Sequence, residues 1–152
     1  MDIAIESVSP RPVAAVRRRL SQPQIAGNFA EPLDKVWRFV RAEDGLVNGG
    51  RNIFLYTHPS DPCAEAMDID FGVEVTRDFA DDGEVHCVHL PAGRAACATH
   101  IGPYARLVET HDDVQRWCAA QGHAIGGHSW EIYGHWTDDP EKLETRVCYL
   151  LK

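Results

Sequence analysis

The chain has 152 residues, of which 44 % are hydrophobic and 25 % are charged, values typical of one globular domain over residues 1–152. A net charge of -8 disfavours direct binding to nucleic-acid phosphate, and no apolar run reaches the ~20 residues that span a bilayer. The first residues carry neither a basic segment nor a long apolar one, which predicts no signal peptide and favours a cytoplasmic location. The five cysteines form no C-x-x-C pair, so we expect free thiols.

The sequence divides into two similar halves, residues 1–79 and 80–152. Each half begins with two predicted strands of small and β-branched residues. These strands are residues 3–8, 12–17, 84–90 and 93–98. The basic run Arg17-Arg18-Arg19 is typical of a solvated strand edge.

One amphipathic helix is predicted next in each half. It has a proline near its start, apolar residues at i, i+3, i+4 and i+7 spacing, and a glycine after its end. The first helix opens at Glu31-Pro32 and stops before Gly45, and the second opens at Gly102-Pro103 and stops before Gly122. The two stripes are Leu33, Val36, Trp37 and Val40, and Tyr104, Leu107, His111, Val114 and Cys118.

Two further strands follow each helix. The first of each pair comes after a Gly-Gly turn, and an acidic, proline-bearing loop separates the two. The strands are residues 53–58, 69–75, 130–135 and 145–150, the turns are Gly49-Gly50 and Gly126-Gly127, and the loops are residues 58–68 and 137–144. This order predicts an α+β fold of two tandem βαββ units, with antiparallel sheets and two main helices.

Strand periodicity places one carboxylate among aromatic residues. Side chains two positions apart share a face of a strand, so Phe54 and Tyr56 face one way, and Glu131, Tyr133 and His135 share a face in the second half. If the two halves correspond, Glu131 occupies the place of Phe54. We therefore predict a single carboxylate surrounded by aromatic side chains of both halves.

Several motifs of the second half resemble the GyrI-like (gyrase-inhibitory-protein-like) small-molecule-binding domain, which is also the effector-binding domain of AraC- and MerR-class regulators. The first half matches this family more loosely. The motifs are Leu90-Pro91-Ala92-Gly93-Arg94, His100-Ile101-Gly102-Pro103-Tyr104, Trp117 with Gly122, and Trp130-Glu131-Ile132-Tyr133, and in the first half Arg11-Pro12-Val13-Ala14 and Phe71-Gly72-Val73.

The resemblance implies a ligand groove between the halves. There, Glu131 with Tyr133 beside it is expected to meet cationic or polar parts of flat, amphipathic ligands. The sequence lacks the helix-turn-helix of the regulator members, so we expect transcriptional control only through a partner. Some family members resemble hydrolases of cyclopropane-bearing, DNA-alkylating toxins, and others resemble toxin-neutralising or gyrase-protecting proteins.

Glu131 is the leading site candidate, because a strand carboxylate between Trp130 and Ile132 is costly to bury without a partner. It either forms a rim ion pair with an arginine or faces a ligand. Tyr133 either packs across the strands or donates a hydrogen bond to the ligand. The cavity walls are predicted to include Phe54, Tyr56, Trp37, Phe71 and Tyr104, with a core role as the alternative for Trp37 and Tyr104, and His58 and His135 at the rim.

The histidines and cysteines suggest no metal or cofactor. His86 and His89 would lie on opposite faces of a strand, and no carboxylate or cysteine completes a set at known spacing, so we predict no metal site. A catalytic Cys–His pair at Cys97 or Cys118 stays open as an alternative.

Three functions follow from these observations. The first is a protein that binds amphipathic, aromatic, cationic drugs or toxins for sequestration or sensing. The second is a hydrolase that opens cyclopropane-type toxins, with Glu131 and Tyr133 as catalytic residues. The third is an acidic protein that binds a topoisomerase or a regulator.

Overall fold

The computed structural model describes residues 2–152, and Met1, the first residue of the predicted first half, lies outside them. The strands are β1 (Ala4–Val8), β2 (Pro12–Ser21), β3 (Asn52–Thr57), β4 (Ala66–Glu74), β5 (His86–His89), β6 (Gly93–Ile101), β7 (Ile125–Tyr133) and β8 (Glu144–Leu151). The helices are α1 (Ile25–Asn28), α2 (Ala30–Ala42) and α3 (Leu107–Ala120), with 3-10 turns η1 (Gln22–Gln24), η2 (Tyr104–Arg106) and η3 (Pro140–Lys142).

The strands form one eight-stranded antiparallel sheet in the order β1-β6-β8-β7-β3-β4-β2-β5. The predicted α+β fold of two βαββ units is thereby confirmed, but the halves exchange their first strands. β1 pairs with β6 of the second half, and β5 pairs with β2 of the first half. The hydrogen-bonded β3–β7 pair joins the two halves at the middle of the sheet.

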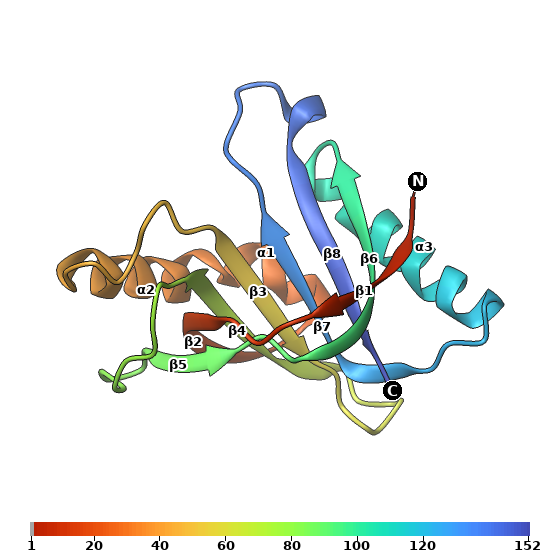
Figure 1. Cartoon of the computed structure of the whole chain (residues 1–152), viewed down its shortest axis with the longest axis horizontal. Coiled ribbons are helices and arrows are strands. Elements are labelled where there is room, and N and C mark those ends of the chain that lie inside the picture. The colour runs from red at the N-terminus through yellow and green to blue at the C-terminus, as the bar shows by residue number, and fades with distance from the viewer. Residues whose placement is uncertain (1) are drawn as a thin grey trace.

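Both long helices cover the same face of the sheet. Figure 1 shows α2 beside the strands of the first half and α3 beside those of the second. The apolar side of α2 packs on a cluster that includes Phe54 and Phe71, and that of α3 packs on Val147 and Tyr149. No helix within residues 2–152 is long and apolar enough to cross a membrane.

The other face of the sheet carries a separate apolar cluster, centred on Leu55, Trp130, Cys97 and Cys148. Its members alternate along the strands with those that face the helices, as strand geometry requires. Trp130 is therefore buried on the face opposite its neighbour Glu131.

Strand β7 differs from its prediction. It begins at Ile125, so Gly126 and Gly127 lie inside the strand and not in a turn before it. The register against β8 is irregular between Ile125 and Ser129, and Gly127 has a φ of 93°. A glycine at positive φ lets a strand bend at such an irregularity without ending.

The basic run agrees with its prediction. Strand β2 pairs with β5 only over residues 12–15, so at Arg17 to Arg19 it pairs with β4 alone among the described strands, and Arg17 and Arg19 are exposed. Its outward arginines are paired across the strands, Arg17 with Asp70 at 3.0 Å and Arg19 with Asp68 at 3.2 Å. Arg18 bonds Glu84 at 2.7 Å. The sequence did not reveal these ion pairs, because the acidic partners come from distant parts of the chain.

Candidate functional site

The centre of the site is the strand pair β3–β7. Phe54 and Glu131 are direct register partners, with Ile53 opposite Ile132 on one side and Leu55 opposite Trp130 on the other. This register places the two positions that the sequence predicted to be equivalent directly opposite each other. A local two-fold axis that relates the halves therefore lies between Phe54 and Glu131.

Three hydrogen-bond donors surround the Glu131 carboxylate, which is only 4 % exposed. The hydroxyls of Tyr56 and Tyr133 donate to Oε1 at 2.6 and 2.7 Å. His111 Nε2 lies 2.6 Å from Oε2. The expected alternative, a rim ion pair with arginine, is absent among the described residues, and two tyrosines and a histidine take its place.

His111 continues the hydrogen-bond chain away from Glu131. Its Nδ1 lies 2.7 Å from the Tyr149 hydroxyl, which also accepts from Gln115 Nε2 at 2.8 Å. When Nε2 carries the proton that Glu131 accepts, Nδ1 accepts the Tyr149 proton, and every group of the chain has a partner. The chain orients the imidazole toward the carboxylate.

The tyrosines of this network are held in their protonated form. Burial, and then the charge of Glu131, raise the pKa of Tyr56 and of Tyr133 well above the ordinary value of 10. Burial raises the pKa of Tyr149 to about 12. At neutral pH all three hydroxyls therefore remain donors.

A cavity of about 950 Å³ opens above this network, between the helices. Glu131, Tyr56 and Tyr133 lie in its wall, as do Ser129 and Tyr149. The space suits a drug-sized molecule, since such ligands occupy clefts of roughly 300–1,000 Å³.

The structure brings most of the predicted wall residues together. Phe54, Trp37 and Tyr104 line the cavity, and Tyr104 meets the Tyr133 ring edge-on at 5.4 Å. Trp37 also donates through Nε1 to Asn52 Oδ1 at 2.9 Å. Phe71 does not line the cavity: it is fully buried and stands behind Phe54, with ring centroids 4.8 Å apart.

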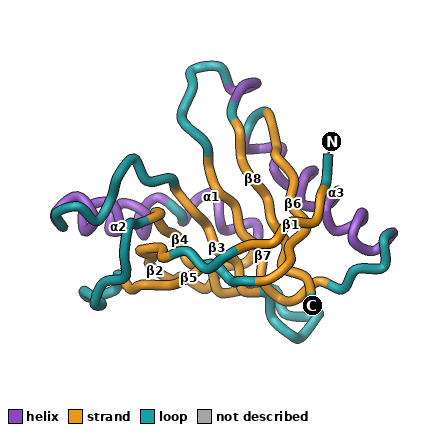
Figure 2. The backbone as a smooth tube through the Cα atoms, in the orientation of Figure 1, coloured by secondary structure: helices purple, strands orange, loops and turns teal. Residues whose placement is uncertain are grey.

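The two predicted rim histidines differ in their surroundings. His58 is partly buried, bonds Ser129 Oγ at 2.7 Å and stacks on Tyr149. Strand β7 ends at Tyr133, so His135 lies in the exposed loop after it and not on the Glu131 strand face, although it still lines the cavity. This loop, residues 134–139, extends beyond the sheet at the top of Figure 2.

Sequence reasoning missed two features of the site. It assigned His111 to an apolar helix stripe, although one titratable residue in such a stripe is a signal for a buried polar partner. It also missed exposed apolar side chains at the cavity mouth, because a single exposed hydrophobic residue carries no sequence signal. They are Phe29, Val108 and Trp136, between 36 and 73 % exposed.

The cysteines proposed as nucleophiles lie outside this cavity. All five thiols are free. Cys97 is buried opposite Cys148 on the far face of the sheet, and Cys118 is buried on the side of α3 that packs on the sheet. Neither belongs to the cavity wall.

Solved structures share this architecture. The C-terminal domain of EcmrR is 18 % identical, with a TM-score of 0.80 over 99 % of this chain and 97 % of that one. SAV2435 bound to tetraphenylphosphonium is 15 % identical, with a TM-score of 0.77 over 100 % and 94 %. A hydrolase from Listeria innocua is 13 % identical, with a TM-score of 0.59 over 99 % and 91 %.

Sequence comparison identifies the family. No curated protein matches the chain. The family model for the GyrI-like small molecule binding domain matches residues 1–152, and the duplicated fold with a cavity between its helices agrees with it. The chain belongs to the GyrI-like small-molecule-binding domain family.

Proposed function

We propose that this protein binds amphipathic organic cations that carry aromatic groups, for sequestration or sensing. The observation that carries the proposal is the Glu131 carboxylate, 4 % exposed, in the wall of an aromatic cavity of about 950 Å³. Three donors solvate this carboxylate in place of water.

The energetics favour a cation over a neutral ligand. A positive charge about 5 Å from the carboxylate gains about 3 kcal/mol at an effective dielectric constant of ~20. Aromatic rings of the cavity wall add cation–π attraction of about 0.5–2 kcal/mol each where a ring face meets the cation. An ordinary apolar pocket offers no such preference for charge.

The mixed wall of the cavity supports an amphipathic ligand. Apolar side chains such as Phe29 and Leu33 lie in the same wall as the Glu131 carboxylate, and both halves also contribute other polar groups, Arg51 and Asp112 among them. A ligand that combines aromatic groups with a positive centre matches this wall. SAV2435, which shares the fold, is bound to a cation of this kind, tetraphenylphosphonium, in which four phenyl groups surround the charged phosphorus.

Matched probes separate charge from shape. Tetraphenylphosphonium and tetraphenylborate have nearly the same shape and opposite charge, and triphenylphosphine oxide is a neutral relative. We expect isothermal titration calorimetry to show binding of the cation, weak binding of the neutral compound and none of the anion. Equal affinity for all three compounds would mean that the protein does not recognise the charge of its ligand.

The role of Glu131 is tested by Glu131→Gln, which keeps the size of the side chain and removes its charge. We expect about a 100-fold loss of tetraphenylphosphonium affinity, the equivalent of about 3 kcal/mol. Glu109→Gln, on the exposed side of α3, is the matched control and should bind as the parent does. If the two variants bind equally well, Glu131 is not the recognition group.

A hydrolase is the second candidate, favoured by the hydrogen-bond chain from Gln115 through Tyr149 and His111 to Glu131. In this reaction Glu131 takes a proton from water, and the water oxygen bonds to a cyclopropane carbon. The broken C–C bond's electron pair passes to a conjugated carbonyl oxygen, to which Tyr133 donates.

Turnover distinguishes the two candidates. Protein is incubated with a tenfold excess of a cyclopropane-bearing alkylator, and ring-opened product is measured by mass spectrometry. Product in excess of protein, lost in Glu131→Gln, supports the enzyme. Depletion of one equivalent without released product supports binding alone.

A further inference from the structure

A second cluster of ligand-type side chains lies away from the cavity, at the β5 edge of the sheet. Asp78, Cys87 and His89 each offer one atom, and these atoms all lie within 4.8 Å of one another. His89 Nε2 is 2.8 Å and Cys87 Sγ 3.9 Å from the same oxygen, Asp78 Oδ1. None of the three residues lines the cavity.

The strand geometry brings the sulfur and the imidazole together. Cys87 and His89 are two positions apart on β5, so they share one face of an edge strand. His86 points to the other face and bonds Asp70 at 3.0 Å. We predicted no metal site from the sequence, because His86 and His89 face opposite ways and no carboxylate or cysteine completes a set at known spacing; the cluster instead joins Cys87-x-His89 to Asp78 of a separate loop.

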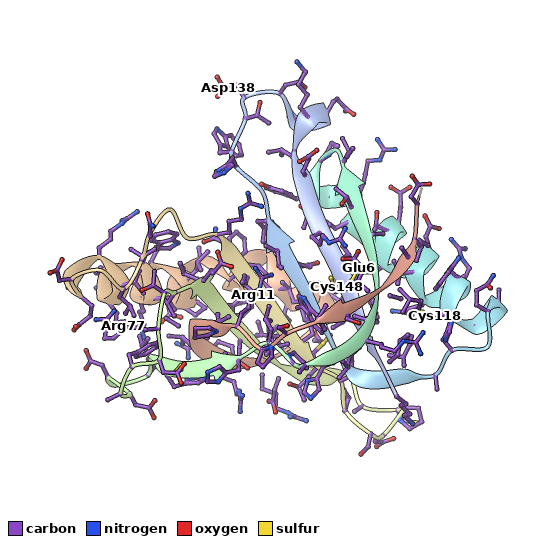
Figure 3. The ribbon with its side chains drawn as sticks, in the orientation of Figure 1. Glu6, Arg11, Arg77, Cys118, Asp138 and Cys148 are labelled. Atoms are coloured by element: carbon purple, nitrogen blue, oxygen red, sulfur yellow. The ribbon has the colours of Figure 1, made fainter. Side chains whose placement is uncertain are left out.

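Asp78 reaches this pair from a loop that is held on both sides. Thr76 donates to Gly45 O at 2.6 Å, and Arg77 bonds Asp44 O. On the other side, Phe79 packs on Phe39 with ring centroids 5.1 Å apart. Figure 3 shows Arg77, the neighbour of Asp78, at the opposite end of the molecule from Cys118 on α3. The Asp78 carboxylate is therefore exposed, but contacts of its neighbours hold its loop in place.

We propose that Asp78, Cys87 and His89 form a binding site for zinc. Thiolate, imidazole and carboxylate are the ligands that zinc takes in proteins, and three of them with a water molecule complete a tetrahedron. Tetrahedral zinc distances place neighbouring ligand atoms about 3.3–3.6 Å apart. Shifts of well under 1 Å bring the two contacts to Asp78 Oδ1 into that range.

The charge of the cluster also favours a cation. The Asp78 carboxylate, whose Oδ1 lies 3.9 Å from Cys87 Sγ, attracts a positive ion to this position. On binding, the thiol proton passes to solvent, and sulfur, nitrogen and oxygen each donate an electron pair to the metal.

The test uses untagged, reduced protein and cobalt(II), whose thiolate charge-transfer absorption reports a cysteine ligand. We expect one equivalent of cobalt to produce this band, and zinc to displace it. Zinc should also raise the midpoint of thermal unfolding. Cys87→Ser should abolish the band, and His89→Gln and Asp78→Asn should each weaken cobalt binding by about tenfold or more.

Cys63→Ser, which removes the other accessible thiol, is the matched control and should keep the band. Circular dichroism verifies that each variant is folded. The proposal is overturned if the parent gives no band, if the band survives Cys87→Ser, or if it is lost in Cys63→Ser. Tetraphenylphosphonium binding should be unchanged by zinc, because the two sites share no residue.

Discussion

The two halves present matching positions to the cavity but fill them with opposite chemistry. The central strand contributes Phe54 in the first half and Glu131 in the second, directly opposite each other. Trp37 on α2 and His111 on α3 occupy equivalent helix positions, because each comes four residues after a buried leucine. Both line the cavity. One half thus supplies an aromatic pair and the other an ion and its partner.

This difference shows how a duplicated fold makes an amphipathic cavity. The backbone is repeated, and both members of each pair of positions line the cavity. At these positions the first half carries aromatic rings, whereas the second half carries the carboxylate and its histidine partner. The charge is tolerated because donors converge on it from both halves, Tyr56 from the first and Tyr133 and His111 from the second.

The largest effect on stability is expected when both central positions carry a glutamate. Phe54→Glu removes a ring that is 5 % exposed and contacts Phe71 and Tyr133, and it places a second carboxyl opposite Glu131. We expect a loss of at least about 3 kcal/mol in unfolding free energy, measured by urea denaturation at pH 7. Phe54→Leu, the apolar control, should lose about 1 kcal/mol, and similar losses for both would refute the like-charge argument.

The next largest effect is expected at the two equivalent helix positions, His111 and Trp37. His111→Phe deprives Glu131 of one donor in a buried site, and we expect a loss of about 2 kcal/mol in unfolding free energy. The matched change Trp37→Phe removes one neutral hydrogen bond and should lose about 1 kcal/mol. His111→Gln retains a donor and should recover much of the difference in the same urea experiment. No recovery would mean that His111 acts through packing.

The two rim histidines should differ in pH dependence. Burial, and then the nearby His111 and His128, lower the pKa of His58 below its ordinary value of 6.5. The unfolded chain takes up this proton near pH 6.5 and the folded chain at a lower pH, so folding stability is retained above about 6.5 and falls as the pH decreases from there.

This slope is measured by thermal unfolding between pH 7.5 and 5.5. His58→Gln should flatten it, whereas His135→Gln, in the exposed loop, should leave it in place. An unchanged slope in His58→Gln would assign the pH dependence to other groups.

The smallest effect is expected at the cavity mouth. Trp136 is 73 % exposed and lines the cavity, so Trp136→Ala should weaken tetraphenylphosphonium binding about threefold, the equivalent of ~0.6 kcal/mol of cation–π attraction. Ile101, which is 63 % exposed but outside the cavity wall, provides the control. If Ile101→Ala has the same effect in calorimetry, the mouth has no specific role.

Local signals were sufficient for the individual elements. The stripe from Leu33 to Val40 and Pro32 near the helix start predicted α2, because helix period and proline preference depend only on neighbouring residues. The Gly126-Gly127 pair misled the prediction, because a glycine pair signals either a turn or a bent strand, and pairing with β8 decides which. The exchange of β1 and β5 was also hidden, since strand partners are non-local.

The site was predictable to the extent that it lies on one strand. Alternation placed Glu131 and Tyr133 on one face, and the repeat matched Glu131 to Phe54. His111 was missed because its partner lies 20 residues away on another element. The Asp78–Cys87–His89 cluster was missed for the same reason, since a loop outside the strand supplies Asp78.

The sequence by itself determined the repeated elements, the family, and which strand face carries the carboxylate, because these depend on period and on short motifs. Only the tertiary structure decided that Phe54 and Glu131 meet at a local two-fold relation, that three donors from both halves hold the charge, and that Phe71 stands behind the wall. Those outcomes depend on strand pairing and helix placement, in which residues far apart in the chain become neighbours.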